Sequence, residues 1–201
     1  MRWLISLPLC LLTAVALAGI TRTPLPWPDR FTARTTLPLT VEKLLPILQQ
    51  PCQVRRWMPG VQQVRILAHP GAGQTRVYMA RSAPWPLQNR DAVTLFSSQP
   101  GDPWVITMQG QPAALPPRPG YVRMPLIEGR WSLQASAGAT LVEYRQRLDP
   151  GGDLPQWLAD RLAPSQIHRT LEALQDYVRH PHPAACPADH AAAAGSGKPL
   201  W

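Results

Sequence analysis

Apolar and polar residues alternate with a period of two through the middle of the chain. Val64 and Ile66, for example, alternate with glutamine and arginine, and Thr140, Val142 and Tyr144 share a face opposite charged residues. Such alternation indicates strands with one buried and one solvated face. The pattern predicts a meander of antiparallel strands at 61–67, 76–81, 92–98, 104–109, 121–135 and 139–148.

Helical spacing flanks this sheet at both ends. After a first strand at 31–39, Thr40 is placed to cap a helix that Pro46 should kink or split. The last ordered element is a helix from about 154 to 178, whose apolar residues recur every three to five positions with a bend at Pro164. Gly129 predicts a bulge or sharp bend in its strand. One long helix on an antiparallel sheet is an α+β architecture.

The two ends of the chain differ from this pattern. Residues 3–19 are almost wholly apolar after Arg2, and Ala16-Leu17-Ala18 is a small-x-small site. We expect a signal peptide over 1–18 and a periplasmic or secreted protein, with an uncleaved inner-membrane anchor as the alternative. Pro-rich residues 19–29 are read as a linker, 30–180 as the folded domain, and 181–201 as a disordered tail.

The charge is one-sided, with 20 Lys+Arg against 12 Asp+Glu, or +8. The basic residues are scattered, so no nucleic-acid partner is expected; the excess fits anionic partners such as phospholipid head groups, or compositional bias alone. Loss of Cys10 with the signal would leave Cys52 and Cys186, which could form a disulfide in an oxidising compartment. The histidines of the tail match no zinc-site spacing, so no metal or cofactor is expected.

Two segments resemble a known family. Residues 83–91 read Ala-Pro-Trp-Pro-Leu-Gln-Asn-Arg-Asp, and 149–158 read Asp-Pro-Gly-Gly-Asp-Leu-Pro-Gln-Trp-Leu. The first resembles the Pro-Trp-Pro…Arg-Asp signature of START (steroidogenic-acute-regulatory-protein-related lipid-transfer) domains, and the second the start of their C-terminal helix. The resemblance spans about 30–180. It implies a helix-grip (START/Bet v 1-like) fold, a curved antiparallel sheet around a long C-terminal helix, with a lipid-sized tunnel between them.

The resemblance implies a pocket lined from the strands. The polar candidates for contacting a ligand are Arg123, Glu128 and Tyr144. The apolar candidates are Val77, Met79, Phe96, Met108, Met124, Leu126, Trp131, Leu133 and Val142. A solid core built from the same residues is the alternative.

Five motif residues are given structural roles: Trp85, Arg90, Asp91, Asp149 and Trp157. Arg90 and Asp91 are expected to form a salt bridge that fixes a strand start, with a head-group contact as the alternative. Trp157 would either lock the helix onto the sheet or contact a membrane.

The sequence departs from the family's sterol carriers at one pair. Those proteins bury a carboxylate and an arginine on neighbouring strands, and the matching positions are Val77 and Phe96, both uncharged. We therefore expect a pocket that holds less water than theirs, and we do not expect sterol recognition through that pair.

The resulting expectation is a monomeric binder of a lipid or other hydrophobic molecule, with transient membrane contact, acting as a periplasmic carrier or sensor and not as an enzyme. One alternative is a cyclase- or hydrolase-like enzyme, which would need a buried ionisable pair such as Glu128 beside Arg123. The other is a membrane-anchored interaction module with a filled core.

Overall fold

The computed structural model describes residues 21–24, 31–83, 85, 87–153 and 156–180. The expected signal peptide and C-terminal tail lie outside these residues. The expected linker is not wholly irregular, because Thr21–Pro24 forms an edge strand. Within the described part of the chain, no helix is long and apolar enough to cross a membrane.

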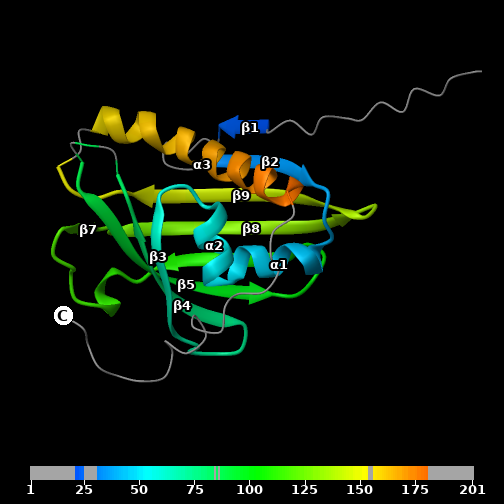
Figure 1. The fold of residues 1–201 in the computed structure, drawn as a ribbon, viewed down its shortest axis with the longest axis horizontal. Coiled ribbons are helices and arrows are strands. Elements are labelled where there is room, and N and C mark those ends of the chain that lie inside the picture. Colours follow the sequence, from blue (N-terminus) through cyan, green and yellow to red (C-terminus); the bar gives the residue numbers. More distant parts are fainter. Residues whose placement is uncertain (1–20, 25–30, 84, 86, 154–155, 181–201) are drawn as a thin grey trace, which may run out of the picture.

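The described elements form a single sheet and three α-helices (Figure 1). In chain order they are β1 (Thr21–Pro24), β2 (Phe31–Leu37), α1 (Val41–Gln49), α2 (Pro51–Trp57), β3 (Val61–Ala68), β4 (Gln74–Arg81), β5 (Asn89–Gln99), β6 (Trp104–Gly110), a 3₁₀ turn η1 (Pro112–Ala114), β7 (Tyr121–Arg123), β8 (Leu126–Ser136), β9 (Ala139–Asp149) and α3 (Gln156–Arg179).

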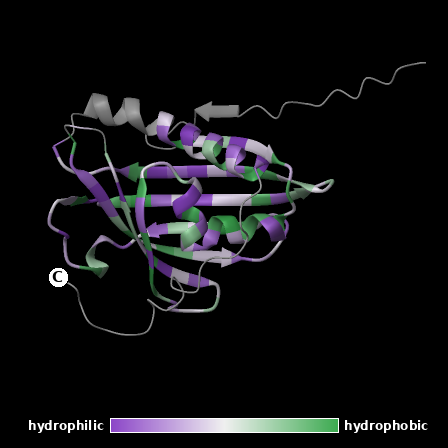
Figure 2. Ribbon diagram, viewed as in Figure 1, coloured by the Kyte–Doolittle hydropathy of each residue, from purple (hydrophilic) through white to green (hydrophobic). Residues whose placement is uncertain are grey.

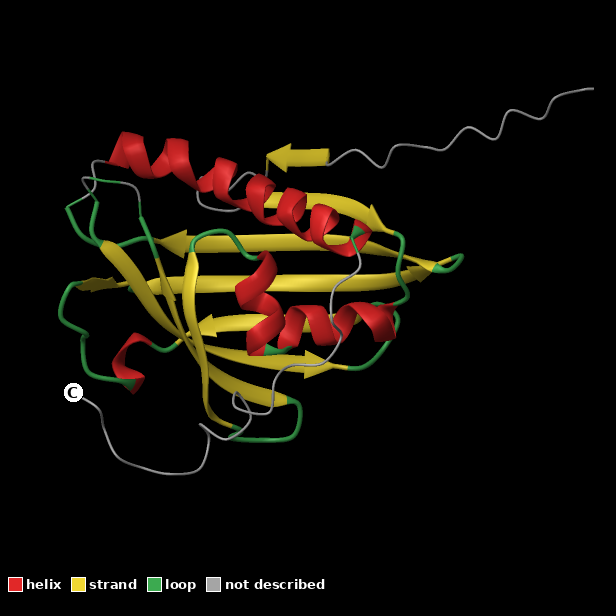
Figure 3. Ribbon diagram, in the orientation of Figure 1, coloured by secondary structure: helices red, strands yellow, loops and turns green. Residues whose placement is uncertain are grey.

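The sheet follows the order β1-β2-β9-β8-β6-β5-β4-β3, with every neighbouring pair antiparallel. The short strand β7 lies off this path and pairs parallel with the first residues of β5. The sheet is curved, and α1, α2 and α3 lie on one side of it (Figure 3). The α+β helix-grip fold expected from the sequence is therefore confirmed.

The main core fills the space between the sheet and the helices. Hydrophobic and hydrophilic bands alternate along β8 and β9 (Figure 2), and the apolar side of each strand faces the helices. Leu133 and Val142 are fully buried here, together with Leu44 of α1 and with Leu171 and Leu174 of α3. The predicted inward face of β9 is confirmed, because Thr140, Val142 and Tyr144 are all buried.

A smaller core lies on the other face of the sheet. Tyr78 and Ala80 of β4 and Val93 of β5 are buried there against Leu115 and Tyr121, which belong to the segment after β6. This segment covers the outer face of β4 and β5, so these two strands are buried on both faces.

Three local expectations need correction. Residues 121–135 form two strands, because Pro125, which has no backbone N–H to donate, separates β7 from β8. Gly129 marks no bulge, since β8 keeps a continuous register with both neighbours. Pro46 lies inside α1 and does not split it; the helical segment is divided after Gln49, where Pro51 begins α2.

Cysteine Cys52 is buried on α2 and is disulfide-bonded. Its partner lies outside the described residues, so the pairing with Cys186 stays a prediction.

Candidate functional site

The sheet and the helices enclose a cavity of about 330 Å³. Its wall combines the inward faces of the central strands with residues of α1, α2 and α3, among them Leu48, Val54, Trp57, Gln166 and Thr170. This volume is at the small end of the range of about 300–1,000 Å³ that is typical of ligand pockets.

The wall is mostly apolar and rich in methionine. The chain has five methionines, and the four after Met1 all line the cavity. They come from separate places: Met58 follows α2, Met79 lies on β4, Met108 on β6 and Met124 between β7 and β8. Because a thioether chain is flexible and polarizable, such a wall can adapt to ligands of different shape.

A glycine makes room for one of these methionines. Gly129 of β8 is the register partner of Met108 of β6. A Cβ at position 129 would lie 2.2 Å from Cε of Met108 and 2.9 Å from the carbonyl oxygen of Arg145. The missing side chain therefore gives Met108 its place in the cavity wall.

Seven of the residues predicted to contact a ligand line the cavity. They are Val77, Met79, Phe96, Met108, Met124, Trp131 and Tyr144. Val77 and Phe96, the uncharged pair singled out in the sequence, both put apolar groups into the wall.

The other five do not line it, for two reasons. Leu133 and Val142 face inward but lie deeper, in the closed core. Leu126 and Glu128 are on the opposite face of β8, where exposed Glu128 lies 3.7 Å from Arg147. Arg123 belongs to the outer face as well, in an ion pair with Asp91.

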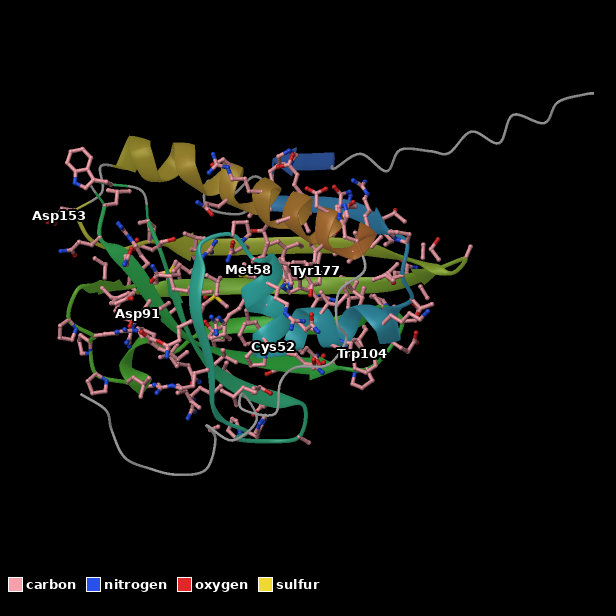
Figure 4. All side chains as sticks on the ribbon, viewed as in Figure 1. Cys52, Met58, Asp91, Trp104, Asp153 and Tyr177 are labelled. Carbon is pink, nitrogen blue, oxygen red and sulfur yellow. The ribbon has the colours of Figure 1, made fainter. Side chains whose placement is uncertain are left out.

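The expected salt bridge between Arg90 and Asp91 does not form. Asp91 faces outward and accepts two hydrogen bonds from Arg123, whereas Arg90 faces inward and lines the cavity. Neighbouring residues of a strand point to opposite faces, which keeps the two groups apart. Asp91 and Asp153 lie toward the same end of the molecule (Figure 4).

The remaining motif residues are Asp149, which ends β9, Trp85, which follows β4, and Trp157, which belongs to α3. Asp149 accepts a 2.8 Å hydrogen bond from the backbone N–H of Gly151, which closes the turn before α3. Trp85 is 93% exposed in the connection between β4 and β5. The side chain of Trp157 is outside the described part of the molecule.

Sequence reasoning missed Arg81 as a residue of the cavity wall. Arg81 and Arg90 are register partners on β4 and β5, and both line the cavity. The signal was available, since Arg81 shares the parity of Val77 and Met79, which were assigned to the pocket. Their charged side chains stand at one end of a mostly apolar wall.

The opposite end of the cavity carries polar side chains, several of which contact one another. Gln49 donates a 3.0 Å hydrogen bond to Oγ of Ser98, which also accepts a 2.8 Å bond from the indole of Trp104. His69 and Thr75 contact each other at 3.3 Å. The Gln49–Ser98 bond ties α1 to the sheet.

The helix α3 is fastened over the cavity by two polar contacts. Tyr177 donates a hydrogen bond to the side-chain oxygen of Gln53 on α2, and Gln175 donates one to the hydroxyl of Thr35 on β2. All four residues are buried. Met58, Cys52 and Tyr177 are close together in the view of Figure 4, where α2 approaches α3.

The chain is similar in sequence to known proteins over most of its length. Residues 28–179 match the model of the family described as polyketide cyclase/dehydrase and lipid transport. An uncharacterised Pseudomonas aeruginosa protein is 30% identical over 139 residues, which cover 68% of this chain and 67% of that protein.

Solved structures share the fold. The STAR-related lipid transfer protein of Xanthomonas axonopodis is 28% identical, with a TM-score of 0.70 over 81% of this chain and 99% of that one. An aromatase/cyclase of Streptomyces is 16% identical, with a TM-score of 0.56 over 74% and 90%. At that identity the second likeness concerns the fold alone.

Proposed function

The chain belongs to the polyketide cyclase/dehydrase and lipid transport family, and on that premise we propose that it carries a lipid in the cavity beneath α3. Its START-type fold supports hydrophobic ligand binding. The observation that carries the proposal is the methionine-rich, apolar cavity of about 330 Å³.

The energetics suit reversible loading. Each methylene moved from water into an apolar pocket gains about 0.8 kcal/mol. A lipid that leaves a membrane for this cavity exchanges one apolar surrounding for another, so most of that gain cancels. Transfer between membranes then needs only a modest difference in affinity, whereas escape into water stays unfavourable.

The kinds of acid–base group in the cavity wall favour a carrier over an enzyme of the same fold. A cyclase or hydrolase would need acid–base groups facing the substrate. Among the described residues of the wall there is no Asp or Glu, and its one histidine, His69, is in contact with the hydroxyl of Thr75 at 3.3 Å. Glu128 and Arg123, the pair that would have supported an enzyme, lie on the outer face and apart from each other in separate ion pairs.

We further propose transient membrane contact through Trp85. Its indole is almost fully exposed, and it belongs to the connection between Arg81 and Arg90, two residues of the cavity wall. Tryptophan is favoured at membrane interfaces, because it combines an apolar body with a polar N–H. Basic groups elsewhere on a chain of net charge +8 would add attraction to anionic lipids.

Export to the periplasm is the proposed location, with the protein acting as a monomer. The apolar N-terminal segment supports it, and so does the disulfide at Cys52, because disulfides persist in oxidising compartments. Mass spectrometry of protein recovered from the periplasm should find a mature N-terminus at Gly19. Intact Met1 would instead support the anchored alternative.

Native mass spectrometry of the purified protein tests the carrier function. The expected result is a bound lipid that organic extraction removes and that identified lipids restore in a 1:1 complex. The proposal is wrong if no lipid co-purifies and the emptied protein also takes up no hydrophobic fluorescent probe.

A further inference from the structure

Two arginines stand side by side in the wall of the cavity. Arg81 and Arg90 are register partners in the antiparallel pair of β4 and β5, and both line the cavity. Side chains at such opposed positions leave the sheet on the same face, with Cβ atoms about 5 Å apart. Two positive charges therefore share one end of a mostly apolar space.

Neither guanidinium has a carboxylate partner in the described part of the chain. The arginine ion pairs there use Arg34, Arg123, Arg145, Arg147 and Arg179. Arg81 donates only to neutral oxygens, the carbonyl of Pro59 at 2.9 Å and the amide of Gln166 at 3.5 Å, and Arg90 donates to the carbonyl of Gln88. A guanidinium has five N–H donors, so both groups keep donors free.

This arrangement costs stability in the empty protein. Burial lowers the pKa of both arginines, which reflects the penalty for a charge removed from water. Like charges directly opposite each other in a sheet add to that cost. An anion bound between them would remove both penalties, and the planar guanidinium suits the two oxygens of a carboxylate or phosphate.

A third group points to the same ligand. Tyr144 lines the cavity, is buried and stacks on Trp131 with ring centroids 3.9 Å apart. Within the described structure its hydroxyl makes no hydrogen bond, although buried tyrosines normally find a partner. The charge of Arg81 acts on this hydroxyl electrostatically. A ligand oxygen near Arg81 would therefore be placed to accept from Tyr144 as well.

We propose that this end of the cavity binds an anionic head group, a carboxylate or phosphate, on a single-chain lipid, with Arg81 and Arg90 as its ligands. The inference rests on the proposed carrier function and names its ligand class. At the other end Gln49 bonds to Ser98 and His69 contacts Thr75, so the acyl chain is placed along Ala92, Thr94 and Phe96 of β5. The small volume favours one acyl chain over two.

The test compares lipids that differ only in charge. The neutral probe N-phenyl-1-naphthylamine is bound first and then displaced by palmitate, by palmitoyl lysophosphatidate, or by uncharged monopalmitoylglycerol. We expect at least one of the two anions to displace the probe at a tenfold lower concentration than the uncharged lipid. The more potent of the two identifies the head group as carboxylate or phosphate.

Variants locate the effect. Arg81→Gln and Arg90→Gln should each weaken the anionic ligand about tenfold and leave the neutral lipid and the probe unchanged. Arg130→Gln removes the same charge from an exposed position on β8 and should change nothing. Probe binding shows that each variant is folded, and Arg90→Gln decides the question if Arg81→Gln does not fold.

The outcomes separate the two proposals. If the probe and all three lipids fail to bind, the carrier function itself is wrong. If the probe and lipids bind, but charged and uncharged lipids compete equally and the arginine variants change neither, the head-group site is wrong while the carrier function stands.

Discussion

Arg123 and Asp91 form a two-point ion pair on the outer face of the sheet, with Nε 2.8 Å from Oδ1 and Nη2 3.0 Å from Oδ2. The carboxylate is fully buried. Arg123 also donates to the carbonyls of Pro112, Leu115 and Pro116. One guanidinium thus fastens the segment after β6 onto β5, and the pair of Arg123 and Asp91 acts as a structural clamp.

Replacing Arg123 with alanine tests this clamp. The change leaves the Asp91 carboxylate buried without its partner, and we expect the free energy of unfolding in urea to fall by about 3–5 kcal/mol. Arg34→Ala breaks a more exposed pair with Glu143 and should cost no more than about 1 kcal/mol. Equal losses in the two variants would contradict a special role for the buried pair.

Filling the cavity should block lipid uptake without unfolding the protein. Ala92 lines the cavity, so a phenylalanine there would occupy ligand space. We expect Ala92→Phe to reduce probe uptake at least tenfold, while its melting temperature stays within a few degrees of the original. Ala135→Phe adds the same ring at an exposed position of β8 and should bind normally. Unchanged uptake by Ala92→Phe would show that ligands bind elsewhere.

Removal of the exposed indole should slow transfer between membranes. Trp85→Ala is expected to reduce the rate of fluorescent-lipid transfer between anionic vesicles several-fold. Unfolding stability should change by less than about 0.5 kcal/mol, because the side chain is solvent-exposed. Leu141→Ala, the matched change at another exposed apolar residue on β9, should transfer at the normal rate. If the two variants transfer equally, Trp85 makes no membrane contact.

Glu143 makes a pH-dependent contribution to the stability of the folded protein. Burial acts to raise the pKa of its carboxyl, but hydrogen bonds from Arg145 and Arg34 outweigh burial and hold the pKa below its usual value. A carboxyl with a lowered folded-state pKa stabilises the protein above its unfolded-state pKa of about 4.3, and this contribution is lost as the pH falls through the folded-state value.

We therefore expect Glu143→Gln to reduce stability at pH 7 by at most about 1 kcal/mol, since its partners are half exposed. Urea unfolding at a series of pH values should show the difference shrinking below about pH 4. A difference of the same size at pH 3 would mean that packing, and not charge, explains it.

The period-two pattern predicted the sheet and the inward face of β9, because alternation directly reports which side of a strand is buried. The pattern could not show which of the inward-facing residues would line the cavity and which would be covered by a helix. Leu133 and Val142 share the inward face with Trp131 and Tyr144, yet α1 and α3 cover them completely. Only the positions of the helices decide which inward residues meet the cavity and which close the core.

The alternation of side chains along each strand would have corrected the choice of polar residues for the cavity. Glu128 is out of phase with Trp131 and so faces outward, whereas Arg81 is in phase with Met79 and faces the cavity. Arg123 could not be placed in this way, since the break at Pro125 resets the alternation between β7 and β8. Its pairing with Asp91 depends on the parallel contact between β5 and β7, which the sequence pattern does not predict.

The second core behind β4 and β5 has a mechanical consequence. Ala80 and Asp91, the immediate neighbours of Arg81 and Arg90, are buried on the reverse side of the same strands. The backbone under the two arginines is therefore braced from behind and cannot yield without breaking that packing. The part of the protein that moves to admit a ligand should therefore be the helices that cover the cavity. We expect the rate of ligand exchange to follow the motions of α2 and α3, while the strands that carry the two arginines stay rigid.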